Sequence, residues 1–415
     1  MSSGTSAERR NEKLWWWVRQ TGLSYAEFAR ELWITAKANG RPDLRPDRTR
    51  IGHWINDGQV PRQPLPEFLA QTVARLRGCI VEPADLGLPR TLPPSAGLGA
   101  VDVARAFARH ATSSELAPSD VAELDLAVHE LTAAYPNRPP GSLWDSAMRH
   151  RQTAHTLLHH RRHTLREGRE IARHAGMLSV VLAWIAHDTG DHEAVAAFAA
   201  DARTHGHQSD APEVTAWAED VLATDTLYDG RPLDALAAAT RGLAVAPRGS
   251  HAAYRLTAQL ARAHARLGDE DGYQEAARRT DAHRPALPQC RSGLFGFDRV
   301  GIDSFNASSF LWLGRPQKAH DAATAAIGQY RSMVAPAAAP TRLAVTGLDL
   351  ALAHAALGDP DEAVRAGRAA LLGVRVVDAV LDRAHQLDLD LRRRFPGRPI
   401  TEDFRDQARA MRPVA

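Results

Sequence analysis

AHDTGDHEAV (residues 186–195) and ALGDPDEAV (356–364) are the first and last of five similar glycine turns in this chain. The three turns between them are TLYDGRPLDAL (226–236), ARLGDEDGY (265–273) and LWLGRPQKAH (311–320). In each turn a helix-forming segment precedes the glycine and another follows it within a few residues. Glycine readily adopts the left-handed backbone that ends a helix, so each stretch predicts the turn of a helical hairpin.

A small residue precedes every one of these glycines at the same distance. Alanine stands seven residues before each glycine, and leucine stands eight before in four of the five cases. Small side chains let paired helices approach closely, so the shared position indicates one repeated packing mode. The glycines are Gly190, Gly230, Gly268, Gly314 and Gly358, and the alanines are Ala183, Ala223, Ala261, Ala307 and Ala351.

This pattern resembles the tetratricopeptide repeat (TPR), in which two helices and a glycine-bearing turn recur. Successive glycines lie 40, 38, 46 and 44 residues apart. The family period is about 34 residues, so these hairpins must have longer helices or added loops. The resemblance implies a TPR-like α-solenoid over residues 143–415, whose concave surface would suit a peptide, a small ligand or another protein. An irregular helical bundle is the alternative.

On that register seven side chains would face the concave surface. A rigid aromatic ring beside an arginine would suit an anionic or peptide ligand. Another interpretation, favoured for each residue taken alone, is that Trp184 and Trp312 pack between neighbouring repeats. The seven residues are Trp184, His187, Tyr228, Arg262, Arg266, Ser308 and Trp312.

Residues 1–90 predict a separate small helical domain. Ser24 and Glu27 have the spacing of a capping box at the start of one helix. Asp47 can cap a short helix that Gly58 would end. The apolar residues of this short helix recur at helical spacing, so they predict a buried stripe and leave the other face exposed. The stripe consists of Ile51, Trp54 and Ile55.

The order of these elements resembles the XRE family of helix-turn-helix domains. The resemblance lies in GLSYAEFAREL (22–32), RTRIGHWINDGQVPRQP (48–64) and RGCIVEPADLGL (77–88). It implies that the third helix enters the major groove of DNA. In that case the residues aligned with base-reading positions are Arg48, Thr49, Arg50 and His53, and those aligned with phosphate contacts are Ser24, Tyr25 and Arg62.

The connection before the third helix is much longer than the tight turn of that family. Two interpretations remain open for the segment ITAKANGRPDLRP (34–46). It extends the second helix, or it adds Lys37, Arg41 and Arg45 as contacts to the DNA backbone.

Composition sets the limits of these interpretations. The formal charge of +2 is nearly balanced and says nothing about nucleic acid. Only Lys13, Lys37 and Lys318 are lysines among 51 basic residues, so an arginine near a proposed contact carries little weight by itself. No stretch approaches the roughly 18 apolar residues of a membrane span, and no secretory signal is visible. We therefore expect a cytoplasmic protein without a membrane segment.

No motif in the sequence predicts catalysis, a cofactor or a metal site. Cys79 and Cys290 are far apart and have no ligand spacing, so we expect both to be buried thiols. His159 and His163 stand four apart in a helix-forming segment, a spacing that can bind a metal, but no acidic or cysteine ligand supports them. We expect neither an enzyme nor a metalloprotein.

Two breaks in the helical pattern suggest the domain boundaries. Proline and glycine interrupt LGLPRTLPPSAGLG (86–99), and YPNRPPGS (135–142) forms a second break. We therefore expect a helix-turn-helix domain over 1–90, a linker with bridging helices over 91–142 and the repeat domain over 143–415.

This order of domains resembles that of actinobacterial regulators and, more distantly, of peptide-sensing quorum regulators. The resemblance implies a homodimeric, sequence-specific transcription regulator of double-stranded DNA whose repeats sense a peptide, small molecule or protein. The alternative is a TPR-type interaction scaffold whose helix-turn-helix does not read DNA. Neither interpretation requires a cofactor.

Overall fold

A computed structural model of the chain describes residues 11–88, 100–283, 293–332, 339–372 and 375–411. Helices make up the regular secondary structure of this part, which contains no strand, so the predicted all-α class is confirmed. The chain divides into two compact units, Met1–Ala106 and Phe107–Ala415. Most of the first predicted break, residues 89–99, lies outside the described residues.

The first unit packs four helices around one apolar core. They are α1 (Glu12–Gln20), α2 (Tyr25–Ala38), α3 (Arg48–Asn56) and α4 (Leu65–Arg77), and the single turn η1 (Pro83–Leu86) follows them. Both predicted caps are confirmed, because Ser24 and Glu27 form a reciprocal capping box and the Asp47 side chain accepts from the Arg50 amide at 2.9 Å. The core contains Leu14, Phe28, Leu32, Ile51, Ile55 and Leu69.

The structure decides two expectations for this unit, the length of its second helix and the burial of Cys79. Helix α2 runs on to Ala38, so the first five of the 13 residues of the long connection before α3 extend the second helix, as one of the two interpretations held. The prediction that Cys79 is buried was wrong: it follows the left-handed Gly78 that ends α4, and it is exposed. Cys290 lies outside the described residues.

Helix α5 (Ala100–Ala111) spans the boundary between the units and buries none of its side chains. The second unit continues with α6 (Pro118–Ala134) and α7 (Pro140–His160), which pack on α8 (Leu165–Thr189). Helix α7 ends at His160, and the chain is extended at Arg161. His159 and His163 therefore do not share a helix, and the helical arrangement that could have brought both imidazoles to one metal is absent.

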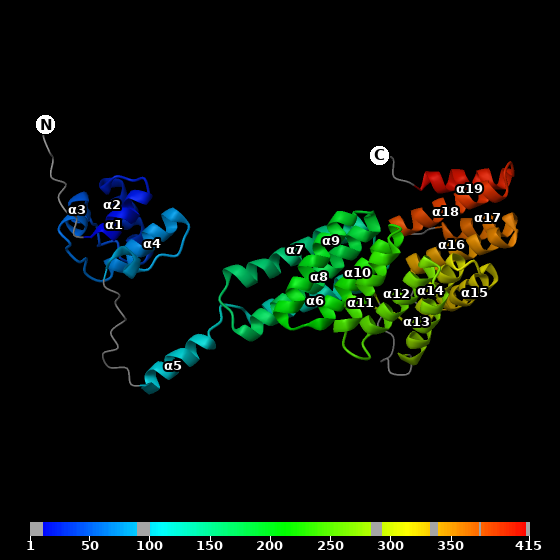
Figure 1. The fold of residues 1–415 in the computed structure, drawn as a ribbon, viewed down its shortest axis with the longest axis horizontal. Helices are drawn as coiled ribbons and strands as arrows, with labels where there is room; N and C mark the ends of the chain where they lie inside the picture. Colours follow the sequence, from blue (N-terminus) through cyan, green and yellow to red (C-terminus); the bar gives the residue numbers. More distant parts are fainter. Residues whose placement is uncertain (1–10, 89–99, 284–292, 333–338, 373–374, 412–415) are drawn as a thin grey trace. The chain divides into compact units, whose positions relative to one another are not determined.

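All five predicted glycine turns join two antiparallel, packed helices (Figure 1). Each glycine has a positive φ, between 68° and 90°, which a side chain would strain. The alanines seven residues earlier are all buried. The hairpins are α8 with α9 (His192–Ser209), α10 (Pro212–Tyr228) with α11 (Pro232–Val245), α12 (His251–Leu267) with α13 (Glu270–His283), α14 (Arg299–Trp312) with α15 (Pro316–Ser332), and α16 (Pro340–Leu357) with α17 (Pro360–Ala370).

The first helices of successive hairpins form one layer. Helices α8, α10, α12, α14 and α16 contact one another in series, which is the arrangement of a solenoid. Two more helices, α18 (Asp378–Arg394) and α19 (Pro399–Ala410), pack on the last hairpin. We call α8 to α19 the array. Among the described residues no helix is both long and apolar enough to cross a bilayer.

The two ends of the array meet. Helix α18 contacts α8, and just before it Arg375 pairs with Asp188 at 2.7 Å, 187 residues away in sequence. The segment before α14 also folds inward: the Leu294 amide donates to the Thr132 carbonyl at 2.9 Å, and Leu294, Phe295 and Phe297 are buried. A Cβ on Gly293 would lie 2.5 Å from that carbonyl, so only glycine fits there.

Candidate functional site

Helix α3 presents four of the predicted DNA-binding residues to solvent. Arg48, Thr49, Arg50 and His53 are all exposed, while the opposite stripe of Ile51, Trp54 and Ile55 is buried as predicted. His53 Nδ1 lies 2.5 Å from Asp57 Oδ2 in the next turn. Neither Arg48 nor Arg50 forms an ion pair with any described residue, so both guanidinium groups remain available to a ligand.

The residues aligned with phosphate contacts have varied surroundings. The Ser24 hydroxyl is engaged in the capping box, since it donates to Glu27 Oε2 at 2.8 Å. Tyr25 begins α2 and is half-buried. Arg62 is exposed in the segment between α3 and α4.

The three basic residues of the long connection have partners of their own. Arg41 pairs with Asp43 at 2.7 Å. The side chains of Lys37 and Arg45 lie 5.6 and 4.6 Å from the ring centre of Trp33, close enough for cation–π attraction. Two cations therefore lie beside the Trp33 ring of α2. Arg41, which is paired with Asp43, is the least available of the three for a contact with DNA.

A second site is a cavity of about 280 Å³ within the array. Its walls come from each of the five first helices, from the inward-folded segment before α14 and from Arg375. The contact of α18 with α8 and the Arg375–Asp188 pair lie at its edge, so the inner face of the first helices forms a pocket that is narrowed on this side. Its apolar lining includes Tyr135, Trp184, Tyr228, Leu294, Phe305 and Val345.

Five of the seven residues predicted for the concave surface line this cavity: Trp184, His187, Tyr228, Arg262 and Ser308. Arg266 and Trp312 lie outside the lining, beside it. Three arginine side chains surround Trp312, with their guanidinium carbons 5.2 to 5.6 Å from its ring centre: Arg262, Arg266 and Arg383. Both interpretations of Trp184 apply, since its ring packs in the core between helices and also forms part of the cavity wall.

Charged side chains in and behind the cavity wall are mostly paired. Burial raises the pKa of Asp349 to about 6, although the charges of Arg383 and Arg262 lower it. Burial likewise lowers the pKa of Arg255 to about 10 despite the charge of Asp220. The attraction within each pair offsets the cost of removing the two charges from water. The pairs are Arg255 with Asp220 at 3.1 Å, Arg375 with Asp188 at 2.7 Å, and Arg383 with Asp349 at 3.0 Å.

Arg262 is the exception. It is 2% exposed and forms no ion pair with a described carboxylate. Its Nη1 donates to Gln259 Oε1 at 3.0 Å, but its Nε finds no hydrogen-bond partner among the described residues. The rings of Phe305, Tyr228 and Trp312 lie 4.3, 5.5 and 5.6 Å from the guanidinium carbon and offset part of the cost of burying this charge. Burial nevertheless leaves the pKa of Arg262 lowered, although interactions with Tyr228 and the charge of Asp349 raise it.

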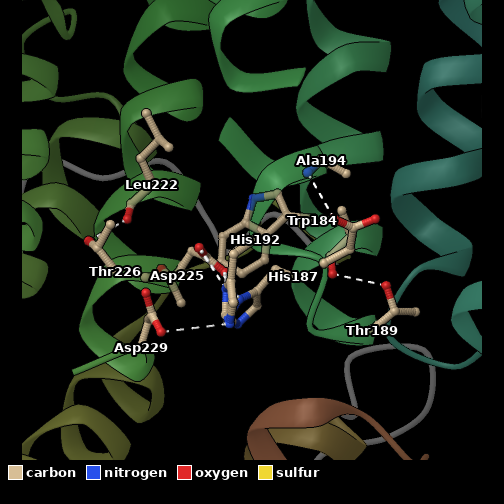
Figure 2. Close-up of polar contacts among 12 residues, drawn as sticks. Trp184, His187, Thr189, His192, Ala194, Leu222, Asp225, Thr226 and Asp229 are labelled. Carbon is tan, nitrogen blue, oxygen red and sulfur yellow. Dashed lines mark hydrogen bonds and ion pairs between the residues drawn. The ribbon is translucent and has the colours of Figure 1, made fainter. Parts of the chain in front are cut away.

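A histidine–aspartate cluster lies where α8 and α9 meet α10 (Figure 2). Buried Asp225 lies 2.9 Å from His187 Nδ1 and 3.0 Å from His192 Nδ1. His187 also lines the cavity, edge-on to Trp184. Burial raises the pKa of Asp225, but the hydrogen bonds and charges of the two imidazoles outweigh it and leave the pKa lowered. Among the described residues no such group has the arrangement needed to hold a metal ion.

The sequence interpretation missed three of the four arginines in the wall. Arg255 stands on α12, seven residues before Arg262 and thus on the same face, so helical periodicity could have found it. Arg342 begins α16, and Arg375 precedes α18; both depend on how the array curves, and no local pattern marks them.

Comparison with known proteins gives one family match, and it falls within the first unit. Residues 14–89 match the family described as the SP15 N-terminal domain, a match that begins within α1 and ends after η1. Neither the curated proteins nor the solved structures contain a match to this chain.

Proposed function

We propose that this chain is a cytoplasmic DNA-binding transcription regulator whose TPR-like array receives a chemical signal. The exposed face of α3 carries the proposal. Arg48, Thr49 and Arg50 occupy the first turn of a helix whose other side is anchored in the core, and His53 follows one turn later on the exposed side. A recognition helix in the major groove uses its N-terminal residues in this way.

The chemistry of these side chains fits base recognition. An arginine can donate two hydrogen bonds to guanine O6 and N7, and threonine can contact either a base edge or the methyl group of thymine. The absence of a described carboxylate partner leaves Arg48 and Arg50 ready for such contacts. The cations around Trp33 and Arg62 would reach phosphates and set the register of the domain on the duplex.

A single small domain contacts few base pairs, so we propose that the regulator binds as a homodimer to an inverted repeat. Ligand binding in the array would then shift the balance between two conformations that differ in affinity for the operator.

The test is a selection of random duplexes by the purified full-length chain at two salt concentrations. We expect an inverted repeat to be enriched, and the Arg48→Ala and Arg50→Ala variants each to lose about 1–3 kcal/mol of operator binding and their preference at one position. Arg30→Ala removes an exposed arginine from α2 and is the matched control, with operator preference retained. Unchanged preference in both α3 variants would refute the assignment.

The cavity favours a second candidate function, a ligand-binding scaffold that does not read DNA. Its volume and its polar wall groups do not depend on nucleic acid. If no duplex is enriched at either salt concentration, with or without a bound ligand, the scaffold is the better interpretation.

A further inference from the structure

We infer that the cavity of the array binds a small organic anion, with a carboxylate or phosphate group held by Arg262 and an apolar ring or chain held by the aromatic wall. The inference rests on the part of the proposed function that gives the array a ligand. It does not depend on DNA binding by α3.

The unpaired charge of Arg262 is the first observation. A guanidinium group buried without a carboxylate is costly, and proteins rarely keep one unless something else compensates it. Its neighbours Arg255, Arg375 and Arg383 each have an acidic partner, so the array can supply such partners where the fold needs them. Arg262 lines the cavity instead, where an incoming anion would pair with it.

The second observation is a surplus of hydrogen-bond donors in the same wall. Six buried polar atoms of lining residues have no hydrogen-bond partner among the described residues, and each of them can donate. One of them, Arg255 Nε, lies 3.1 Å from Asp220 in an ion pair, which leaves five. Buried polar groups are nearly always satisfied, so this set indicates a ligand rich in acceptors. The atoms are Arg262 Nε, Trp184 Nε1, Arg375 Nη1, Tyr330 Oη and Thr341 Oγ1.

The start of α16 adds to the positive potential. Ala339, Thr341 and Arg342 line the cavity, and Ala339, as the N-cap residue, offers no side-chain acceptor to the first-turn amides. Arg342 has no ion pair with a described residue. Unsatisfied amides and the helix dipole at an N-terminus both favour an anion. Two aspartates also line the cavity, but Asp188 is paired with Arg375 and Asp298 caps α14.

Size and lining define the rest of the ligand. A cavity of about 280 Å³ is at the lower limit of ligand sites, and it suits a molecule with one ring or a short chain. Trp184, Tyr228 and Phe305 supply flat apolar faces beside Arg262. The arrangement favours an aromatic or short aliphatic acid or phosphate ester.

The test compares benzoate, phenyl phosphate and uncharged benzyl alcohol by titration calorimetry and thermal unfolding of the full-length chain. We expect at least one of the two anions to bind and raise the unfolding temperature, and benzyl alcohol to bind at least about tenfold more weakly. Whichever of benzoate and phenyl phosphate binds more tightly shows whether the site prefers a carboxylate or a phosphate group.

Variants locate the binding. Arg262→Met should reduce anion affinity at least about tenfold, since it removes a charged donor. Without ligand it should unfold at the same or a higher temperature than the wild type. Arg266→Met is the matched control, because Arg266 stands one turn along α12 and lies beside the same Trp312 ring but outside the cavity lining. Its anion affinity should be unchanged. Arg342→Met gives a second test from a partly exposed position, and we expect weaker binding there as well.

Three outcomes would overturn the inference: no binding of either anion, equal binding of benzyl alcohol, or anion binding that survives both Arg262→Met and Arg342→Met. The duplex selection is independent of these measurements. If an anion binds but no duplex is enriched, either with or without that anion, the regulator is refuted and this inference stands. If a duplex is enriched but neither anion binds, the regulator stands and this inference is refuted.

Discussion

The N-terminal unit and the array place the same side chain in opposite surroundings. On α3, Arg48 and Arg50 are exposed, so water solvates their charge and a carboxylate partner is unnecessary. In the array three arginine side chains are at most 5% exposed, and each lies within 3.1 Å of a carboxylate. Arg262 is buried as well but has no such partner. In a chain this rich in arginine, burial and pairing, and not abundance, indicate which guanidinium groups are available to bind something.

Arg383→Met should have the largest effect on stability. It would leave Asp349 buried with its main counter-charge removed, and breaking a buried pair in this way costs about 3–5 kcal/mol. Arg262→Met should change the free energy of unfolding by less than about 1 kcal/mol, because Asp349 keeps its direct ion pair with Arg383 and loses only the more distant charge of Arg262. Chemical denaturation of the full-length chain, followed by circular dichroism, measures both.

An exposed control completes this comparison. Arg50→Met on α3 should alter stability by no more than about 0.5 kcal/mol, as for most surface substitutions. If Arg262→Met proved as destabilising as Arg383→Met, the guanidinium of Arg262 would be compensated within the fold, and the case for an anionic ligand would fail.

The cap of α3 should have a smaller and local effect. Asp47→Ala removes the acceptor of the Arg50 amide, which costs about 1 kcal/mol and would speed amide exchange in α3 roughly fivefold. Asp47→Asn keeps a capping oxygen and is the matched control. Hydrogen exchange over residues 48–56 of the full-length chain reports the difference. Equal exchange in the two variants would mean that packing alone holds α3 in place.

The local parts of this fold could be predicted from sequence because local interactions determine them. Ser24 with Glu27, Asp47 before α3, and the five glycines each satisfy backbone groups within a few residues. The buried stripe of α3 follows from helical spacing alone. Five lining residues of the cavity were found because they share the inner face of the first helices, which the hairpin register already placed.

The remaining part of the cavity depends on contacts between distant segments. Small rotations from one hairpin to the next bring Arg375 to Asp188, 187 residues away, and no sequence period encodes their sum. Charge offers no help, since 51 basic and 49 acidic residues allow many pairings. The inward fold at Gly293 follows from a close backbone approach that exists only once α6 is in place.

The pair of His192 and Asp225 is intermediate between the exposed arginines of α3 and the buried ion pairs of the array. The His192 side chain is partly exposed, while Asp225 is buried (Figure 2). Burial lowers the pKa of His192, but the hydrogen bond to Asp225 and the charges of Asp225, Asp229 and Asp378 leave the pKa raised. The folded chain therefore holds this proton more tightly than the unfolded chain. His192 stabilises the fold fully below its ordinary pKa of 6.5, and that contribution is lost as the pH rises through the raised value.

Denaturation midpoints between about pH 5.5 and 8.5 should accordingly fall less steeply with pH in His192→Asn than in the wild type. Asp225 contributes no slope in this window, because its lowered pKa keeps it ionised and its own contribution is lost only in acid. His110→Asn removes an exposed histidine of α5 and should leave the wild-type slope unchanged. If the denaturation midpoints of His192→Asn and the wild type fell equally with pH, solvent would screen even this half-buried pair. Only full burial would then distinguish the charged pairs of the array from the exposed arginines of α3.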